Sequence, residues 1–495
     1  MAATIGISSL EDIREGLSSG DLSSQSLVRV CLENLQLLEP SFNAITSTDP
    51  GRCLNLAKAA DARLQQGERG PMLGIPIVLK DNLHWTGLPV SNGSKITAGY
   101  VAHYDATVVQ RLLEAGAVPI AKANMDEFAM GSSGEYSAFG PTRNPWDLSR
   151  VPGGSSSGSI VSVAAGYAPF ALGSDTGGSV RLPAGFCNVT ALRPTYGVLS
   201  RYGVTAMASS LDQVGPAART AAGVAAGLSV MTGRDPKDST SVDLPRAEQL
   251  ANLKPALLKG LRVGLPMEYF GGGLDPAVRG IVERAVRTLE QEGASVLEIS
   301  LPHTSYAIDT YYLICTSEVS SNMSRFDGVR YGARQSADTL DGMLSGTREQ
   351  GFGAEVKRRI LLGAFCLSKG YYDAFYLKAL KARTLITKDF TDAFEKVDVI
   401  ATPVSPNVAF PIGDKTLDPM AMYLADAYTV TTPLAALPCL SMPGGFSNGL
   451  PVGVQLIGPS LSDVHLLEVV HAFQQLTDHH LQTPPHLNRG VNHGH

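Results

Sequence analysis

A serine that follows two glycines stands near the middle of LGSDTGGSVRLPA, residues 172–184. The preceding APFALG predicts a strand that delivers the chain into Asp175-Thr176-Gly177-Gly178-Ser179. Two glycines before a serine allow consecutive backbone N–H groups to face one point, as an oxyanion hole requires. Ser179 would then attack a carbonyl and have the resulting oxyanion held by its own turn. An anion-binding turn or a merely tight turn explains the same residues, so this segment alone leaves both interpretations open.

Lys80 closes a second apolar run, GIPIVLK, which predicts a strand. At such a position a lysine is most often a surface residue whose aliphatic stem covers apolar side chains. If Lys80 is buried instead, desolvation lowers its pKa, and the neutral amine becomes a general base.

The third segment, VPGGSSSGS at residues 151–159, resembles a flexible linker in composition, yet a small apolar run follows it at once. Residues 154–158 match the G-x-S-x-G pattern of a nucleophile elbow centred on Ser156. An elbow requires a strand directly before it, whereas this chain has Pro152-Gly153 there. The sequence therefore disfavours Ser156 as a nucleophile.

Together the three segments are more specific than any one of them. In order and spacing, GIPIVLKDN, PGGSSSGS and GSDTGGSVRLPA resemble the amidase signature family, which hydrolyses amides with a Ser–cis-Ser–Lys triad. The resemblance implies that Ser179 is the nucleophile, that Ser155 is the bridging serine held by a cis peptide bond, and that Lys80 is the base. Ser155 follows Lys80 by 75 residues and precedes Ser179 by 24, as the family requires.

The resemblance also assigns the oxyanion hole and marks one departure. The N–H groups of Thr176, Gly177 and Gly178, together with that of Ser179, would hold the oxyanion. Ser157 stands where the family usually has glycine. Because Ser157 is beside the predicted catalytic turn and is not a reacting group, we expect it to tune activity without abolishing it.

Further segments narrow the resemblance to the A subunits of bacterial glutamyl-tRNA(Gln)/aspartyl-tRNA(Asn) amidotransferases. They include NMDEFAMGSS, FGPTRNPWD, ASSLDQVGP, SRFDGVRYG, EVKRRILLG and DPMAMYLADAYT. The resemblance implies a glutaminase half-reaction, in which glutamine acylates Ser179 and the released ammonia passes through a tunnel to a B subunit. ATP and Mg, used by that B subunit, would serve to amidate Glu-tRNA(Gln) or Asp-tRNA(Asn), and a small C subunit would complete a heterotrimer. The chain itself would need no cofactor and no metal.

Glutamine must also be recognised at its backbone end, by a cation for the carboxylate and an anion for the ammonium. Given the resemblance, Arg359 in EVKRRI fits the first role, since a guanidinium binds a carboxylate bidentately. Asp426 in MYLADAY fits the second, and Tyr311 would line the same pocket, although the adjacent Tyr312 leaves that choice open. Without the resemblance, Arg359 would be taken as a solvated helix end and Asp426 as a surface charge.

The elements that must position these residues follow an α/β pattern, since short apolar strands alternate with amphipathic helices from residue 74 onward. We expect an amidase signature fold, with a large mixed β-sheet core covered by helices on both sides. Residues 1–65 are predicted to form an N-terminal helical layer, beginning with a capping box of Ser8 and Glu11, and residues 66–485 the amidase signature domain. Within it, residues 305–395 are expected to be a mostly helical insertion over the active site, and residues 486–495 a polar tail.

Composition limits the class of protein. The chain has 495 residues, of which 44% are hydrophobic and 17% charged, with a formal net charge of −6 and no block of Lys and Arg. These values describe a globular enzyme and disfavour a chain that grips nucleic acid alone. Six cysteines without a C-x-x-C pair, no signal peptide and no stretch of membrane-spanning length lead us to expect a cytoplasmic protein.

Two other functions compete with a role in an amidotransferase complex. One is a stand-alone amidase that hydrolyses small amides without partners, and the other is a non-catalytic scaffold that keeps the fold. All three triad positions are intact, which disfavours the scaffold. The sequence does not say whether Glu-tRNA(Gln) or Asp-tRNA(Asn) is the substrate in the cell.

Overall fold

A mixed sheet of eleven strands runs through the protein, whose computed structural model describes residues 8–485 and 487. In chain order the strands are β1 (Ile45–Ser47), β2 (Pro76–Lys80), β3 (Val118–Ala123), β4 (Phe170–Asp175), β5 (Thr190–Arg193), β6 (Gln213–Ala218), β7 (Arg262–Pro266), β8 (Ser295–Ile299), β9 (Val399–Pro403), β10 (Cys439–Ser447) and β11 (Leu450–Ile457). Across the sheet their order is β1-β3-β2-β4-β6-β5-β10-β11-β9-β7-β8.

Helices connect many of the strands. They are α2 (Leu10–Ser19), α3 (Ser24–Phe42), α4 (Pro50–Gln65), α5 (Thr107–Glu114), α6 (Ser157–Ala164), α7 (Arg181–Cys187), α8 (Ala221–Met231), α9 (Pro276–Gln291), α10 (Ala307–Met323), α11 (Leu340–Gly351), α12 (Ala354–Leu367), α13 (Lys378–Phe394), α14 (Pro419–Leu424), α15 (Thr431–Leu434) and α16 (Asp463–Leu476). Shorter 3-10 and π turns are η1 (Glu127–Ala129), η2 (Ala247–Asn252), η3 (Met267–Phe270), η4 (Pro302–Tyr306), η5 (Asp373–Leu377) and η6 (His479–Leu481).

Strand β2 is parallel to both of its neighbours, and this brings two predicted site segments together. Leu79 pairs with Lys122 of β3 on one side and with Leu172 of β4 on the other. Because β2 and β4 run in the same direction, Lys80 and Asp175, at their carboxyl ends, reach the same edge of the sheet. The turn with Ser179 follows β4 directly.

The sheet buries alternate residues of its strands against helices on both faces. Ile77 and Leu79 of β2 belong to a large apolar cluster that includes residues of α2, α5, α8, α9 and α16. Val78, between them, belongs to a second cluster with residues of α3, α4, α6 and α7. The alternation follows from the two-residue period of a strand. The predicted fold class, a mixed sheet with helices on both sides, is confirmed.

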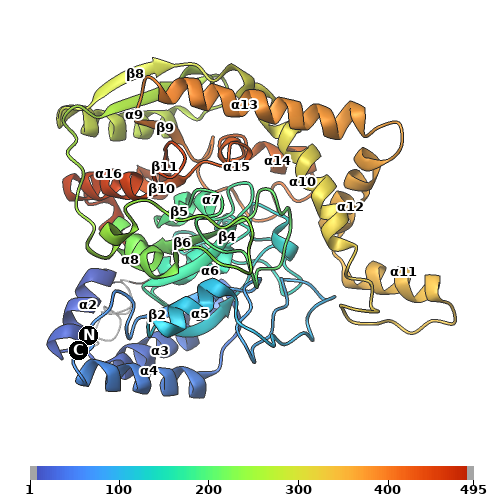
Figure 1. Ribbon diagram of the computed structural model, residues 1–495, viewed down its shortest axis with the longest axis horizontal. Helices are drawn as coiled ribbons and strands as arrows, with labels where there is room; N and C mark the ends of the chain where they lie inside the picture. Colours follow the sequence, from blue (N-terminus) through green and yellow to red (C-terminus); the bar gives the residue numbers. More distant parts are fainter. Residues whose placement is uncertain (1–7, 486, 488–495) are drawn as a thin grey trace.

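The N-terminal helices α2, α3 and α4 gather at one end of the molecule (Figure 1). They are not the whole of this region, because β1 pairs antiparallel with β3 and forms one edge of the sheet. The predicted capping box of Ser8 and Glu11 is wrong: Ser9 is the N-cap of α2, and its Oγ accepts the N–H of Asp12 at 3.1 Å. Residues 1–7, and the predicted tail 486–495 except for residue 487, lie outside the described residues.

Residues 305–395 are mainly helical and form a third apolar cluster against the end of the sheet. Helices α10 and α12 lie side by side, α13 runs along the top of the view, and α11 projects from the body (Figure 1). Phe128 of η1 packs on Phe326 and Phe352, with ring centroids 4.8 and 5.7 Å apart, and so joins this cluster to the segment after β3. No helix in the described part of the chain has the length and apolarity needed to cross a membrane.

Candidate active site

Lys80 is fully buried at the end of β2, which excludes the surface position that such a lysine usually takes. Its Nζ lies 2.7 Å from Oγ of Ser155, 3.0 Å from Oγ of Ser156 and 3.0 Å from Oγ of Ser174. Within the described residues it has no ion pair with a carboxylate. Four polar atoms therefore surround the amine, because the backbone oxygen of Ser174 also lies 3.3 Å away.

Burial without an ion pair determines the charge of Lys80. Desolvation lowers the pKa of Lys80 from its ordinary 10.5 to about 7, against the opposing charges of Asp126, Asp175 and Asp212. A large fraction of the amine is thus neutral near neutral pH. A neutral amine beside a serine hydroxyl can act as a general base.

Ser155 follows a cis peptide bond between Gly154 and Ser155, as the family resemblance implied. Asp126 adjoins this bond, since its backbone N–H donates to the backbone oxygen of Ser155 at 3.3 Å and a side chain on Gly154 would meet its carboxylate. The carboxylate also accepts the N–H groups of Gly134 and Tyr136, at 3.0 and 2.9 Å. Asp126 therefore holds the cis turn and the 134–136 loop together.

Ser179 is 7% exposed and ends the turn after β4. Its backbone oxygen accepts the N–H of Ser156 at 3.0 Å, which ties the two serine turns to each other. Its hydroxyl has no hydrogen-bond partner within residues 8–485. The structure thus brings Lys80 into contact with Ser155 and places Ser179 on the adjoining turn.

Asp175 organises the turn that carries Ser179. Its carboxylate accepts the N–H of Gly178 at 3.0 Å, and Arg181 donates to it with Nε at 2.9 Å and Nη2 at 3.1 Å. Burial would raise the pKa of Asp175, but Arg181 and Arg193 outweigh it and hold this pKa at about 2. The carboxylate is therefore a fixed anion beneath the turn.

The bond to Asp175 changes the predicted oxyanion hole. The N–H of Gly178 was expected to bind the oxyanion, but it donates to the carboxylate of Asp175 instead. The N–H groups of Thr176, Gly177 and Ser179 have no acceptor within the described residues. Gly178 has a φ of +132°, and a side chain there would collide with Thr429. Glycine is required at this position for both reasons.

Asp426 is buried, and its carboxylate accepts the hydroxyl of Tyr312 at 2.8 Å. Burial raises the pKa of Asp426 from 3.8 to about 6, opposed by Tyr312 and by the charge of Arg359. Tyr311 has a different place, because a side chain on Gly177 would collide with its hydroxyl. Both tyrosines thus belong to the site: Tyr311 packs on the turn before Ser179, and Tyr312 bonds Asp426.

Arg359 is 3% exposed, which excludes a solvated helix end. Its Nε donates to Glu355 at 2.8 Å, one turn earlier on α12, and its guanidinium lies 5.3 Å from the ring of Tyr312 and 5.5 Å from that of Tyr423. Burial would lower the pKa of Arg359, but Tyr312 and Glu355 raise it well above its ordinary value. Its two Nη atoms have no partner in the described part of the chain, and two parallel N–H groups are the arrangement that grips a carboxylate.

Thr429 joins the two halves of the site. Its hydroxyl donates to the backbone oxygen of Gly177 at 2.6 Å, and its N–H donates to the backbone oxygen of Asp426 at 3.0 Å. Thr429 therefore links Asp426 to the turn that carries Ser179.

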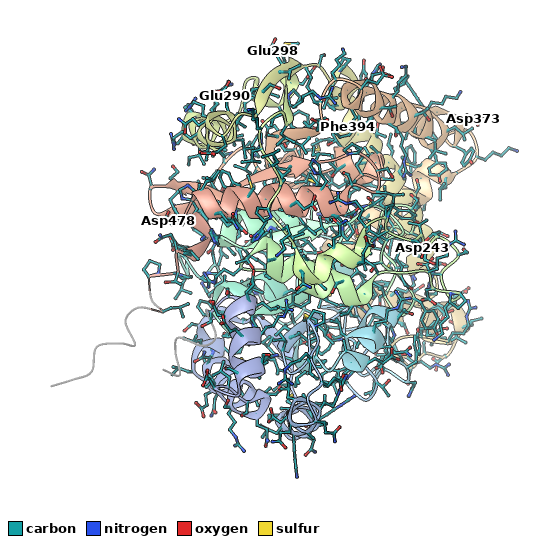
Figure 2. All side chains as sticks on the ribbon, turned by 60° about the vertical axis from the view of Figure 1, so that its left-hand side comes forward. Asp243, Glu290, Glu298, Asp373, Phe394 and Asp478 are labelled. Carbon is teal, nitrogen blue, oxygen red and sulfur yellow. The ribbon has the colours of Figure 1, made fainter. Side chains whose placement is uncertain are left out.

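Sequence reasoning missed several residues of this site. No role was predicted for Asp126 or Asp175, although both lie in segments that resemble the family. Glu355 could have been predicted as the partner of Arg359, because it precedes Arg359 by four residues on a predicted helix. Ser157 is now placed: its hydroxyl lies 3.2 Å from Oγ1 of Thr142 and makes no contact with Lys80. Exposed carboxylates such as Glu298 and Asp478 lie at the edge of the molecule in Figure 2, whereas Asp126, Asp175 and Asp426 are buried.

The chain is similar to known proteins over most of its length. The family model described as Amidase matches residues 26–467. The A subunit of glutamyl-tRNA(Gln) amidotransferase from Moorella thermoacetica is 52% identical over 96% of this chain and 97% of its own, and that from Methylococcus capsulatus is 52% identical over 96% and 98%.

The chain is also similar to solved structures. The A subunit of glutamyl-tRNA(Gln) amidotransferase from Thermotoga maritima is 38% identical, with a TM-score of 0.79 over 95% of each chain. Native peptide amidase from Stenotrophomonas maltophilia is 30% identical, with a TM-score of 0.82 over 97% of this chain and 99% of that one. The resemblance drawn from the three segments is confirmed. The chain belongs to the amidase family.

Proposed function

We propose that this chain is the glutaminase subunit of a tRNA-dependent amidotransferase and supplies ammonia for converting Glu-tRNA(Gln) to Gln-tRNA(Gln) or Asp-tRNA(Asn) to Asn-tRNA(Asn). Relatives named as the A subunit of glutamyl-tRNA(Gln) amidotransferase match nearly its whole length at about half identity, which supports this role. One contact carries the chemistry: Nζ of Lys80 lies 2.7 Å from Oγ of Ser155, and no carboxylate of residues 8–485 pairs with it.

The acylation step uses three side chains. Ser179 gives its proton to Ser155 as Ser155 gives its own to the neutral amine of Lys80, and Oγ of Ser179 attacks the side-chain carbonyl of glutamine. The N–H groups of Thr176, Gly177 and Ser179 stabilise the oxyanion. As the intermediate collapses, the Lys80 ammonium returns a proton through Ser155 to the leaving nitrogen, and ammonia departs.

Deacylation repeats these steps with water. A water molecule loses a proton along the same path, attacks the acyl carbon and releases glutamate, while Ser179 recovers its proton. Both steps need Lys80 neutral at the start, which its lowered pKa provides at neutral pH.

Recognition of glutamine uses the second cluster. Arg359 binds the α-carboxylate with its two unused Nη atoms, and Asp426 binds the α-ammonium. Tyr311, against Gly177, lines the wall between this cluster and the nucleophile.

The remaining parts of the reaction belong to partner chains. A B subunit would use ATP and Mg to activate the misacylated tRNA and receive the ammonia, and a C subunit would complete a heterotrimer in the cytoplasm. Six unpaired, buried cysteines suit a reducing compartment.

The test is Ser179→Ala in the complex reconstituted with its B and C subunits. We expect glutamine-dependent formation of Gln-tRNA(Gln) or Asn-tRNA(Asn) to fall to background, with ammonia-dependent formation unchanged. Glutamine hydrolysis surviving in the variant would refute the nucleophile. An isolated wild-type chain that hydrolyses small amides at full rate, with no response to partners or tRNA, would favour the stand-alone amidase instead.

A further inference from the structure

The amine of Lys80 has more neighbours than a proton relay needs. Only Ser155 lies on the path to Ser179, yet Ser156 and Ser174 contact the same nitrogen at 3.0 Å each. A neutral amine has two N–H groups and one lone pair. It removes a proton from Ser155 only when the lone pair faces Ser155, so something must occupy the two N–H groups.

Ser156 is bound in a way that leaves it only an acceptor toward Lys80. Its hydroxyl donates to the backbone oxygen of Ser174 at 3.0 Å and accepts the N–H of Ser174 at 3.2 Å. Its hydrogen is therefore used, and one lone pair remains for Lys80. Ser156 takes one N–H of the amine.

Ser174 is held by a residue outside the predicted triad. Nδ2 of Asn82 lies 3.0 Å from Oγ of Ser174, and among the described residues this hydroxyl has no other partner than Lys80. Both residues border a cavity of about 240 Å³, so packing alone does not fix the hydroxyl. Asn82 is 3% exposed, and its Oδ1 has no hydrogen-bond partner in the described part of the chain.

We propose that Asn82 and Ser174 are positioning residues: Ser174, held by Asn82, takes the second N–H of Lys80 and so directs its lone pair at Ser155. This inference rests on the proposed function, since it takes Lys80 to be the base. Asn82, in the segment LKDN, and Ser174, on β4, thereby have a role in catalysis although neither belongs to the triad.

Protonation gives this arrangement a measurable signature. The ammonium donates three hydrogen bonds, and the hydroxyls of Ser155, Ser156 and Ser174 are its three side-chain acceptors. Loss of the Ser174 hydroxyl removes one bond to the charged form, so the pKa of Lys80 falls by about one unit. The neutral amine also loses its orientation, so the rate at high pH falls as well.

Other charged groups near Lys80 stay the same in this comparison. They are Asp126 beside the cis turn, Asp175 on β4 with its partners Arg181 and Arg193, and Asp212. Asp126, with a pKa of about 6, titrates in the same range. Since every variant keeps these groups, a difference between variants reports Ser174.

The experiment measures the labelling rate of Ser179 by phenylmethanesulfonyl fluoride from pH 5.5 to 9, with intact-mass detection and peptide mapping. The reagent contains no glutamine part, so the result is independent of substrate and partners. For the wild-type chain we expect a rate that rises with pH through a midpoint near 7. For Ser174→Ala we expect a midpoint about one unit lower and a plateau about tenfold lower.

Three further variants make the result specific. Ser174→Thr keeps a hydroxyl and should restore the wild-type midpoint. Asn82→Ala should shift midpoint and plateau in the direction of Ser174→Ala, by less, and serves if Ser174→Ala does not fold. Ser159→Ala is the matched control, since its buried hydroxyl bonds the backbone oxygen of Leu172 on the same strand and does not touch Lys80.

Two results would be decisive against the inference. Unchanged midpoints in Ser174→Ala and Asn82→Ala would overturn it, and so would an equal shift in Ser159→Ala. Label absent from Ser179 in the wild-type chain would instead refute the proposed nucleophile, so the two failures are distinguishable.

Discussion

The site contains two buried cations in contrasting surroundings. Lys80 is enclosed by serine hydroxyls and has no ion pair among the described residues, and desolvation lowers its pKa to about 7. Arg359 is equally buried but pairs with Glu355 and lies against Tyr312 and Tyr423, so its pKa is raised well above its ordinary value. The two buried cations thus have pKa values shifted in opposite directions: hydroxyl neighbours leave desolvation dominant at Lys80, whereas Tyr312 and Glu355 outweigh it at Arg359.

The contrast matches what each group is proposed to do. A base must lose its charge before it can take a proton, and hydroxyl neighbours solvate the amine without fixing a proton on it. A carboxylate-binding group must keep its charge, and a buried partner anion ensures that it does. Four substitutions or conditions test this contrast, from the largest expected effect to the smallest.

Lys80→Met removes the base and should reduce glutamine hydrolysis at least about 10³-fold. Since no carboxylate loses an ion pair, we expect the unfolding free energy to be retained or increased. Steady-state kinetics and chemical denaturation measure the two quantities. Retention of most activity near pH 7 would exclude Lys80 as the base.

Lys122→Met is the matched change on the neighbouring strand β3. It should lower the unfolding free energy and have a smaller effect on glutamine hydrolysis than Lys80→Met. Lys122 is fully buried, and its Nζ lies 3.3 Å from Oδ1 of Asp81. Removing one partner of a buried ion pair costs about 3–5 kcal/mol of stability. If denaturation gave equal stabilities for the Lys80 and Lys122 variants, the distinction between paired and unpaired burial would be wrong.

Arg359→Ala should raise KM for glutamine about 100-fold with a smaller effect on kcat, because the carboxylate loses its bidentate partner. Arg358→Ala is the control, since this neighbour pairs with the same Glu355 but its side chain is 40% exposed. An unchanged KM in Arg359→Ala would remove Arg359 from the pocket.

The pH dependence should separate the two clusters. Below about pH 7 Lys80 becomes protonated and kcat falls up to tenfold for each unit, since only the neutral amine accepts a proton. Below about pH 6 Asp426 becomes neutral and KM rises, since only the carboxylate pairs with an ammonium. Measuring kcat and KM for glutamine between pH 5 and 9 gives both transitions. If kcat and KM changed at the same pH, one group would control both.

Much of the site was accessible from sequence because its segments are short and local. The DTGGS turn carries its glycines and its serine together, and the strand before it follows from APFALG. Tyr312 was harder to assign, because residues 311 and 312 are adjacent on a helix and only packing decides which one meets Gly177 and which one Asp426. Asp126 was missed for a similar reason, since its contact with Gly154 joins loops that are distant in the chain.

The sequence by itself determined the family, the order of the three segments and the fold class. It did not separate Lys80 from Lys122, which both stand at the end of apolar runs, GIPIVLK and AVPIAK. Only the tertiary structure places Asp81 beside Lys122 and three serine hydroxyls around Lys80. The pKa of a buried amine depends on the groups that surround it in space, and for Lys80 most of these come from segments more than 70 residues away in the chain.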